Sequence, residues 1–143
     1  MILYNTLTRN KEELKQNKIN MYVCGVTVYD RPHLGHALST VTFDVLHRYL
    51  EYKGFKVKRV QNFTDVDDKI INKSKELKIS AKEVAEKYIK SFFEDMDALG
   101  VRRADVHPRA TEDMKEILEF IRNLIQKKAA YVSNGSVYFD VSY

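Results

Sequence analysis

Residues 19–36, INMYVCGVTVYDRPHLGH, decide the fold of this chain of 143 residues. The run 19–24 is short and rich in β-forming residues and is followed by Gly25, so it predicts a buried strand that ends in a tight turn. From Gly35 to Gly54, apolar residues recur at helical spacing, which predicts an amphipathic helix. Residues 55–60 predict a second strand, and the whole segment therefore predicts a βαβ unit with parallel strands. The apolar series of the helix is Leu38, Val41, Val45, Tyr49 and Tyr52.

Two helices are expected directly after this unit. Asp65 precedes a helix that runs to about Leu77. Ser80 and Glu83 have the spacing of a capping box, which opens a helix that ends near Gly100. The apolar stripe of that helix consists of Val84, Tyr88, Phe92 and Met96.

A fourth helix and a hairpin are expected in the last part of the chain. The fourth helix is expected to start at Thr111, which is followed by acidic Glu112 and Asp113, and to carry Lys127 and Lys128 in its last turn. These charges complement the helix dipole at both ends. The runs 130–132 and 137–141 flank Asn134-Gly135, a strong signal for the turn of a β-hairpin. The elements together predict an α/β fold.

Composition limits the class of protein. Charged residues make up 31% of the chain and apolar residues 44%, and no apolar run approaches the roughly 18 residues that a membrane span requires. The start of the chain lacks a signal-peptide pattern, so a cytoplasmic protein without a membrane segment is expected. The net charge of +4 permits contact with a polyanion, but the lysines are spread over several helices, which favours solvated faces.

The single cysteine limits the roles that its sulfur can have. Cys24 is the only cysteine, so an internal disulfide is excluded. Its sulfur is then a buried packing group, a reactive thiol or a metal ligand.

The motif His33-Leu34-Gly35-His36 stands between the first strand and the first helix. In an open α/β sheet, ligands bind beyond the carboxyl ends of the strands, and a helix amino terminus there offers unpaired N–H groups to an anion. His33 and His36 can add imidazole donors to phosphate oxygens, and Gly35 permits close approach of a nucleotide. H-x-G-H alone is short enough to occur by chance, so its position gives it most of its weight.

Two other groups of polar residues are given structural roles. His47 and His107 have no partner pattern and are interpreted as surface or capping histidines. Asp65, Asp67 and Asp68 crowd together as metal ligands do, but they stand at the start of a helix. Capping is therefore the favoured role for Asp65 and Asp68.

Several longer motifs follow one another along essentially the whole chain: LYNTLTR (3–9), MYVCGVTVYD (21–30), HLGH (33–36), FDVLHRYLEYKG (43–54), QNFTDVDDKI (61–70), PRATE (108–112) and AYVSNGSVYFDV (130–141). These motifs resemble those of the cysteinyl-tRNA synthetase family, in the family's order and spacing. Leu34 replaces the more usual isoleucine of the family's HIGH motif, which conserves volume. The resemblance implies that residues 1–107 form the first half of a Rossmann-like catalytic domain. It also implies that residues 108–143 are a helix and β-hairpin that begin the connective insertion.

The activity that this resemblance implies is that of a cysteine–tRNA ligase. Cysteine is activated by ATP to cysteinyl-adenylate and then transferred to tRNA(Cys), Mg²⁺ accompanies the ATP, and a monomer is expected. His33 and His36 are the expected catalytic residues, and Thr64 is expected to face the amino-acid pocket. The residues expected to bind ATP are Gly25, Thr27, His33, Gly35 and His36.

The resemblance also implies a zinc ion. In the family, the cysteine at the position of Cys24 binds zinc, and the zinc recognises the thiolate of the substrate, which is a better zinc ligand than a hydroxyl. The family's remaining zinc ligands and its KMSKS loop lie beyond residue 143. The chain is therefore expected to be an amino-terminal fragment that holds zinc poorly and has little or no activity by itself.

Three alternatives remain open. A cysteine ligase of thiol-cofactor biosynthesis uses the same zinc, ATP and adenylate but transfers cysteine to an amino sugar. A small nucleotidyltransferase also binds phosphates with H-x-G-H, although its second phosphate motif is not found after Gly100. A non-catalytic module derived from a synthetase is the third.

Overall fold

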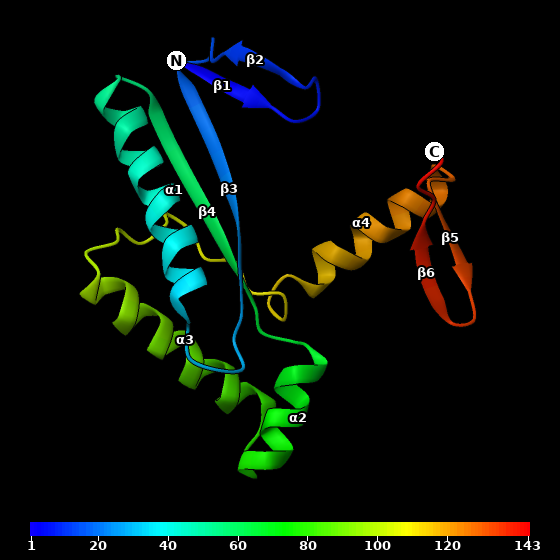
Figure 1. Cartoon of the computed structure of the whole chain (residues 1–143). Helices are drawn as coiled ribbons and strands as arrows, with labels where there is room; N and C mark the ends of the chain where they lie inside the picture. The colour runs from blue at the N-terminus through cyan, green and yellow to red at the C-terminus, as the bar shows by residue number, and fades with distance from the viewer.

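The computed structural model describes residues 1–143, and its centre is a parallel pair of strands (Figure 1). Strands β3 (Lys18–Thr27) and β4 (Lys56–Thr64) are joined by helix α1 (Leu34–Tyr52). Their register runs from Lys18 opposite Lys56 to Thr27 opposite Thr64. The βαβ unit is confirmed, and both strands are longer than predicted because each continues toward the site at its carboxyl end.

A third segment extends this sheet beside β4. Isolated parallel bridges pair Val60 with Val106 and Phe63 with Arg109. The backbone N–H of Phe63 donates to the carbonyl of Pro108 at 2.8 Å, which continues the same contact. Strand β4 therefore lies between β3 and residues 106–109.

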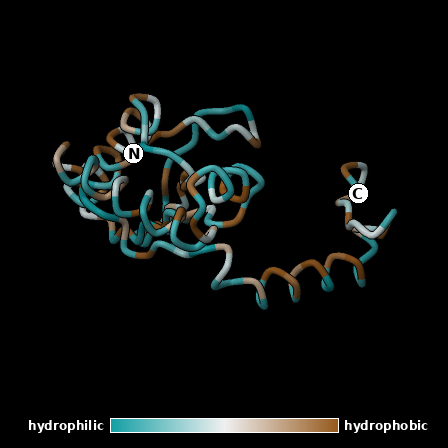
Figure 2. Tube along the Cα trace, turned by 90° about the horizontal axis from the view of Figure 1, so that it is seen from below, coloured by the Kyte–Doolittle hydropathy of each residue, from teal (hydrophilic) through white to brown (hydrophobic).

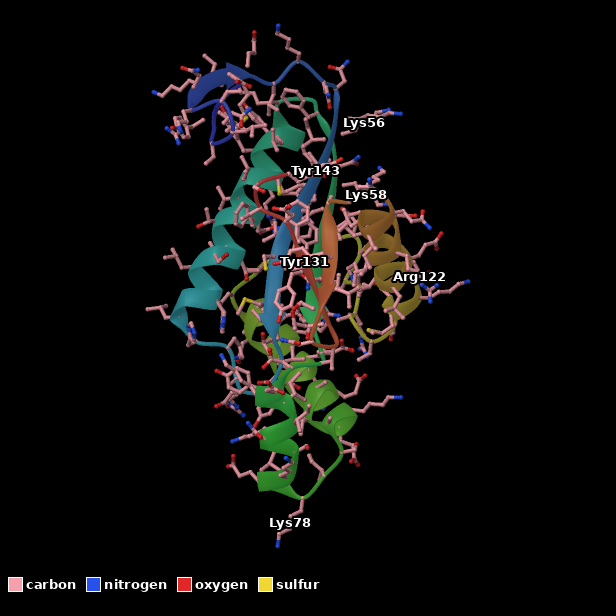
Figure 3. All side chains as sticks on the ribbon, turned by 90° about the vertical axis from the view of Figure 1, so that its right-hand side faces the viewer. Lys56, Lys58, Lys78, Arg122, Tyr131 and Tyr143 are labelled. Carbon is pink, nitrogen blue, oxygen red and sulfur yellow. The ribbon has the colours of Figure 1, made fainter.

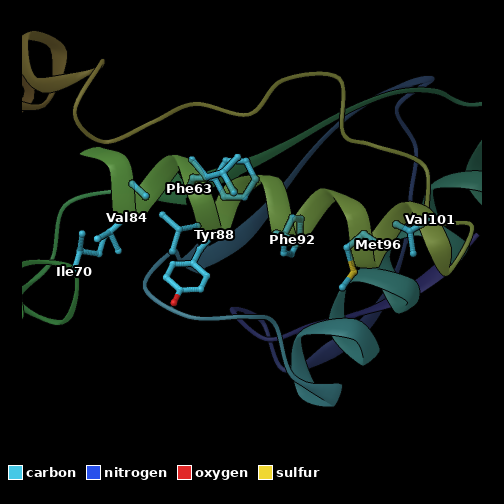
Figure 4. Packing of buried hydrophobic residues seen from close by; sticks show 10 residues of the cluster. Phe63, Ile70, Val84, Tyr88, Phe92, Met96 and Val101 are labelled. Carbon is cyan, nitrogen blue, oxygen red and sulfur yellow. The ribbon is translucent and has the colours of Figure 1, made fainter. Parts of the chain in front are cut away.

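Helix α3 (Ala81–Ala98) provides most of the hydrophobic core (Figure 4). Its predicted apolar stripe is confirmed, since Val84, Tyr88, Phe92 and Met96 are all buried. The ring of Phe63 on β4 meets the edge of Phe92 at a centroid distance of 5.4 Å. Helix α2 (Asp68–Leu77) adds Ile70, which is fully buried in the same cluster.

Helix α1 is confirmed, but its buried face is not the predicted apolar series. Those five apolar side chains are between 36% and 82% exposed. Asp44 is buried because the guanidinium of Arg59, on β4, lies against it, with Nη1 3.4 Å from Oδ1. A polar contact therefore joins the helix to the sheet. Its buried residues are Thr40, Asp44, His47 and Leu50.

Helix α4 (Met114–Gln126) and the hairpin of β5 (Ala130–Ser133) and β6 (Ser136–Phe139) extend away from the rest of the chain (Figure 1). Figure 2 shows a hydrophobic side running along α4, and no residue of this helix is buried. Asn134 and Gly135 have positive φ angles of 49° and 77°, which confirms the predicted turn.

Three details of the predicted elements need correction. Helix α4 begins at Met114 rather than at Thr111, whose backbone N–H donates to a side chain elsewhere in the chain. The last strand ends at Phe139 rather than at residue 141. The antiparallel hairpin of β1 (Ile2–Asn5) and β2 (Asn10–Glu13) was not predicted at all.

The predicted capping box at the start of α3 is confirmed. The Ser80 hydroxyl accepts from the Glu83 N–H at 3.2 Å, and the Glu83 carboxylate accepts from the Ser80 N–H at 2.8 Å. The helix ends at Ala98, and Gly100 follows with a φ of 70°. None of the helices combines the length and apolar character that crossing a membrane demands.

Exposed basic side chains are distributed over several elements. Figure 3 shows Lys56 and Lys58 on β4, Lys78 at the end of α2 and Arg122 on α4, and all four residues are exposed. This distribution agrees with the prediction that the net charge of +4 belongs to solvated faces.

Candidate functional site

The candidate site lies where β3, β4 and α1 meet. Thr27 and Thr64 are register partners at the carboxyl ends of the two parallel strands, and the N–H of Val28 donates to the carbonyl of Thr64 at 3.2 Å. Helix α1 begins a few residues farther along the chain, and His33 is its N-cap residue. Thr27 and His36 line one small hollow there. The structure thus brings together the strand ends and the HLGH motif, as the sequence predicts.

The two histidines of the motif cap the helix through their side chains. Nδ1 of His33 accepts from the N–H of Gly35 at 3.1 Å, and Nδ1 of His36 accepts from the N–H of His33 at 3.2 Å. The rings stack, with centroids 3.8 Å apart and planes 20° from parallel. This is a reciprocal capping box made of two imidazoles in place of the usual serine and glutamate.

This capping changes the predicted mode of anion binding. The N–H of Gly35 is used by the His33 ring, and the N–H of His36 donates to the carbonyl of His33 at 2.9 Å. These backbone donors are therefore engaged, contrary to the expectation of unpaired N–H groups. Because each Nδ1 is an acceptor, the neutral rings carry their proton on Nε2, which remains the donor for an anion.

The protonation state of His36 follows from its surroundings. Partial burial lowers the pKa of His36, and the positive charge of a protonated His33 lowers it further. The neutral form is therefore favoured at pH 7. This form keeps Nδ1 free to accept the helix-capping hydrogen bond.

Glycine at position 35 also avoids a tight contact within the chain. A Cβ atom there would lie 3.0 Å from Cε1 of the His33 ring, tighter than an ordinary contact. The predicted role of Gly35, close approach of a nucleotide, is thus accompanied by a structural one, which is room for the capping ring.

Gly25 permits an even closer approach between the strands. A Cβ at this position would lie 1.5 Å from the carbonyl oxygen of Asn62. The Asn62 side-chain oxygen accepts from the Gly25 N–H at 2.8 Å and from the Tyr22 hydroxyl at 2.9 Å. The register of β3 and β4 shifts at this place, between Val23 and Val26. Sequence analysis missed Asn62, because a contact between positions 25 and 62 leaves no periodic signal.

Cys24 lies next to this register shift and is exposed. The alternative of a buried packing cysteine is therefore wrong. No group of three or more histidine, cysteine, aspartate or glutamate side chains is arranged to hold a metal ion. An exposed thiol suits zinc as a ligand, but a four-coordinate site at Cys24 requires ligands from outside these residues.

Residues 10–143 match the family described as the tRNA synthetases class I (C) catalytic domain. The chain belongs to this family. The match includes β2, β3 and every later element of the structure.

Curated relatives of this chain are named cysteine–tRNA ligases. The cysteine–tRNA ligase of Clostridioides difficile (strain 630) is 57% identical over 99% of this chain and 31% of its own length. Those of Thermococcus gammatolerans and Staphylococcus epidermidis are each 54% identical, over 97% and 96% of this chain. The chain spans about 30% of the length of the curated relatives it matches.

A solved structure supports the class I synthetase fold. The agnB2 LeuRS of Agrobacterium radiobacter K84, in a ternary complex with tRNA and LeuAMS, matches with a TM-score of 0.67. It is 15% identical and covers 83% of this chain and 16% of its own. At this identity the likeness shows the fold alone, and it agrees with the predicted Rossmann-like α/β class.

Within this synthetase domain, the acidic cluster differs from the prediction. Asp67, rather than Asp65, is the N-cap of α2, and its Oδ1 accepts from the N–H of Lys69 at 2.8 Å. Asp65 is buried and accepts from both the N–H and the hydroxyl of Thr111. Asp65 therefore ties the end of β4 to the segment after residue 109, and only Asp68 lies in the first turn as predicted.

The interpretation of the two remaining histidines is wrong. His47 is 2% exposed, and His107 stacks on Phe63 at a centroid distance of 5.3 Å. Nδ1 of His107 donates to the carbonyl of Gln61 at 2.9 Å, while its Nε2 is buried without a partner. Burial lowers the pKa of His107. His47 is therefore buried and His107 is partly buried, so neither is an ordinary surface histidine.

Proposed function

We propose that this chain is the part of a cysteine–tRNA ligase that binds ATP for the activation of cysteine. The observation that carries this proposal is the stacked pair of His33 and His36 at the start of α1, with each Nδ1 used for capping and each Nε2 left as a donor. The family match and the names of the relatives support the reaction. They favour it over a small nucleotidyltransferase and over a ligase that acts on an amino sugar.

In this proposal the two imidazoles hold the phosphates of ATP. Their Nε2–H groups are donors held in place by the cap, so they stabilise charge that develops as the cysteine carboxylate attacks the α-phosphate. Thr27 shares a hollow with His36 and is assigned to the nucleotide. Gly25 and Gly35 let the backbone and the capping ring come close at the same site. Mg²⁺ accompanies the ATP as part of the substrate.

The amino acid is assigned to the neighbouring strand end. Thr64 is the register partner of Thr27, so a cysteine beside Thr64 lies next to the nucleotide. Exposed Cys24 is assigned as one zinc ligand. A bound zinc ion would supply a thiolate-selective contact for the substrate. Because Cys24 alone is a single ligand, residues 1–143 are expected to retain zinc weakly and to lack exchange activity.

The chain is further assigned to two parts of the enzyme. Residues 1–107 are proposed as the first half of the Rossmann-like domain, and residues 108–143 as the start of the connective insertion. The extension of α4 and the final hairpin away from the sheet supports this division (Figure 1). The whole protein is proposed to act on tRNA(Cys) as a cytoplasmic monomer.

Calorimetric titration of the chain with ATP and Mg²⁺ tests the role of the imidazoles. His33→Asn keeps a side-chain acceptor for the helix cap but removes the Nε2 donor. We expect at least a tenfold weaker ATP affinity, because a hydrogen bond to a charged group contributes about 1.5–3 kcal/mol. Ser39→Ala, at an exposed position of α1, is the matched control and should leave the affinity unchanged. Equal affinity of His33→Asn and the unaltered chain contradicts the assignment.

The reaction itself is tested in a protein of the relatives' full length. Cysteine-dependent exchange between ATP and pyrophosphate should be lost in Cys24→Ser and His36→Ala. Charging of tRNA(Cys), rather than amide formation with an amino sugar, should consume the adenylate. If residues 1–143 alone catalysed exchange between ATP and pyrophosphate, the expectation that Cys24 as a single zinc ligand is insufficient would be contradicted.

A further inference from the structure

A cavity of about 290 Å³ lies between α2, α3 and the segment 109–112, separate from the HLGH motif. Its apolar wall includes Ile70, which is fully buried, and the small residues Ala81 and Ala85, which are one turn apart on α3. Figure 4 shows Ile70 and Val84 together at this end of α3. The small side chains on α3 leave the space open, and the volume is at the lower end of that of small-molecule sites.

The charged residues around the cavity are predominantly acidic. They are four carboxylates, from Asp65, Asp67, Glu86 and Glu112, and two cations, from Lys82 and Arg109. The charge of Arg109 is already matched, since its guanidinium contacts Glu86 and lies 3.8 Å from Glu112. The rim therefore has an excess of negative charge, which favours a cation and disfavours an anion.

We propose that this cavity is a second ligand site that takes a small organic amine, with its apolar body against Ile70, Ala81 and Ala85 and its ammonium group toward the acidic rim. The apolar wall buries the apolar body of the ligand without requiring one orientation, and the carboxylates favour a positively charged head group. None of the residues assigned to ATP, cysteine or zinc lines the cavity. The site is therefore independent of the proposed function.

Three matched probes test the class of ligand on the 143-residue chain. Phenethylamine, 2-phenylethanol and 3-phenylpropionate have the same ring and differ in the charge of the head group. We expect phenethylamine to bind about fivefold more tightly than the alcohol, the factor that one charge contact near the surface supports, and the acid to bind most weakly. Added salt should reduce the preference for the amine. Equal affinities of the three probes, or no binding of the amine, overturn the proposal.

Two substitutions test the place of binding. Ala81→Met fills the cavity from a half-buried position and should weaken the amine at least tenfold, whereas Ala98→Met, at the exposed end of the same helix, should not. Glu112→Gln should reduce the preference for the amine over the alcohol, and Glu119→Gln on α4 should leave it unchanged. Amide chemical shifts that move only in α2, α3 and residues 109–112 support the site. Unchanged affinity in Ala81→Met, or shifts confined to other elements, overturns it.

Discussion

Arg59 on β4 and Asp44 on α1 form an ion pair beneath the helix, with side chains 2% and 7% exposed and Nη1 3.4 Å from Oδ1. Asp44 also accepts from Nε of Arg48 at 2.8 Å, so one carboxylate serves two guanidinium groups. The pair fixes the face of α1 that meets the sheet. It thereby sets the direction in which the amino terminus of the helix, with the two capping histidines, approaches the strand ends.

Removing one partner of this pair should destabilise the chain strongly. Asp44→Asn removes the carboxylate that forms an ion pair with the buried Arg59 guanidinium, and the expected loss is about 3 kcal/mol in the free energy of unfolding. Glu94→Gln removes the exposed contact of Glu94 with Lys90 and should cost less than about 1 kcal/mol. Urea denaturation of both variants measures the difference. Similar midpoints would contradict a buried role for Asp44.

Two phenylalanines on different helices should respond very differently to truncation. Phe92 on α3 is 3% exposed and packs against Phe63, whereas Phe120 on α4 is 64% exposed. Phe92→Ala should reduce stability by about 3–5 kcal/mol through lost burial and a cavity. Phe120→Ala should change stability by less than about 0.5 kcal/mol. Thermal unfolding followed by circular dichroism compares them, and a large loss in Phe120→Ala would mean that α4 is packed in solution.

The helices, the strands after residue 17 and most helix ends could be predicted because their signals are local. The capping box of Ser80 and Glu83 and the turn at Asn134-Gly135 are defined by side chains within a few residues. The apolar stripe of α3 also predicted the core correctly, because that helix carries apolar residues on one face only. Local chemistry and tertiary packing agree at these places.

The buried face of α1 could not be predicted from its periodicity. The spacing of apolar residues shows that a helix has one distinct face, but not which residues pack against it. In α1 the residue that packs against the buried face, Arg59, comes from β4. The contact of Asp65 with Thr111 spans 46 residues, and it draws Asp65 away from its predicted capping role and Thr111 away from the predicted helix start. His107 reaches the interior in the same way, through Gln61 and Phe63. Such pairs leave no pattern in a single sequence.

The candidate site was predicted in its position but not in its internal hydrogen bonding. HLGH was placed correctly at the junction of strand and helix. The reciprocal use of Nδ1 by His33 and His36 could not be predicted, since histidine is not among the preferred helix caps.

Acidification should destabilise the chain through His107. Burial holds the pKa of His107 below its usual value near 6.5, so the unfolded chain takes up this proton first as the pH falls. Stability is then constant above the unfolded pKa and declines as the pH falls from it toward the folded pKa. His107→Phe keeps a stacked ring but cannot titrate, and its stability should fall less between about pH 8 and about pH 5. Histidine NMR titration checks the direction of the shift directly.

The partial burial of His36 should also lower the stability of the chain as the pH falls. Its pKa is also lowered, so part of the decline should persist in His107→Phe. His36→Asn, measured in the same series, separates the two contributions. An unchanged pH dependence of stability in His107→Phe would show that His107 is accessible to water in the folded chain.

Substitution of Gly25 should disrupt the sheet at the site. In Gly25→Ala the new Cβ would lie 1.5 Å from the carbonyl oxygen of Asn62, so β3 and β4 must separate where their register shifts. We expect a loss of more than about 3 kcal/mol, with the hydrogen bond from the Gly25 N–H to Asn62 broken. Gly54→Ala is the matched control, since its Cβ meets nothing within 4 Å and only the positive φ of 88° costs about 1 kcal/mol. Urea denaturation and hydrogen exchange of the β3 amides measure both effects, and equal losses in the two variants would place Gly25 outside a close contact.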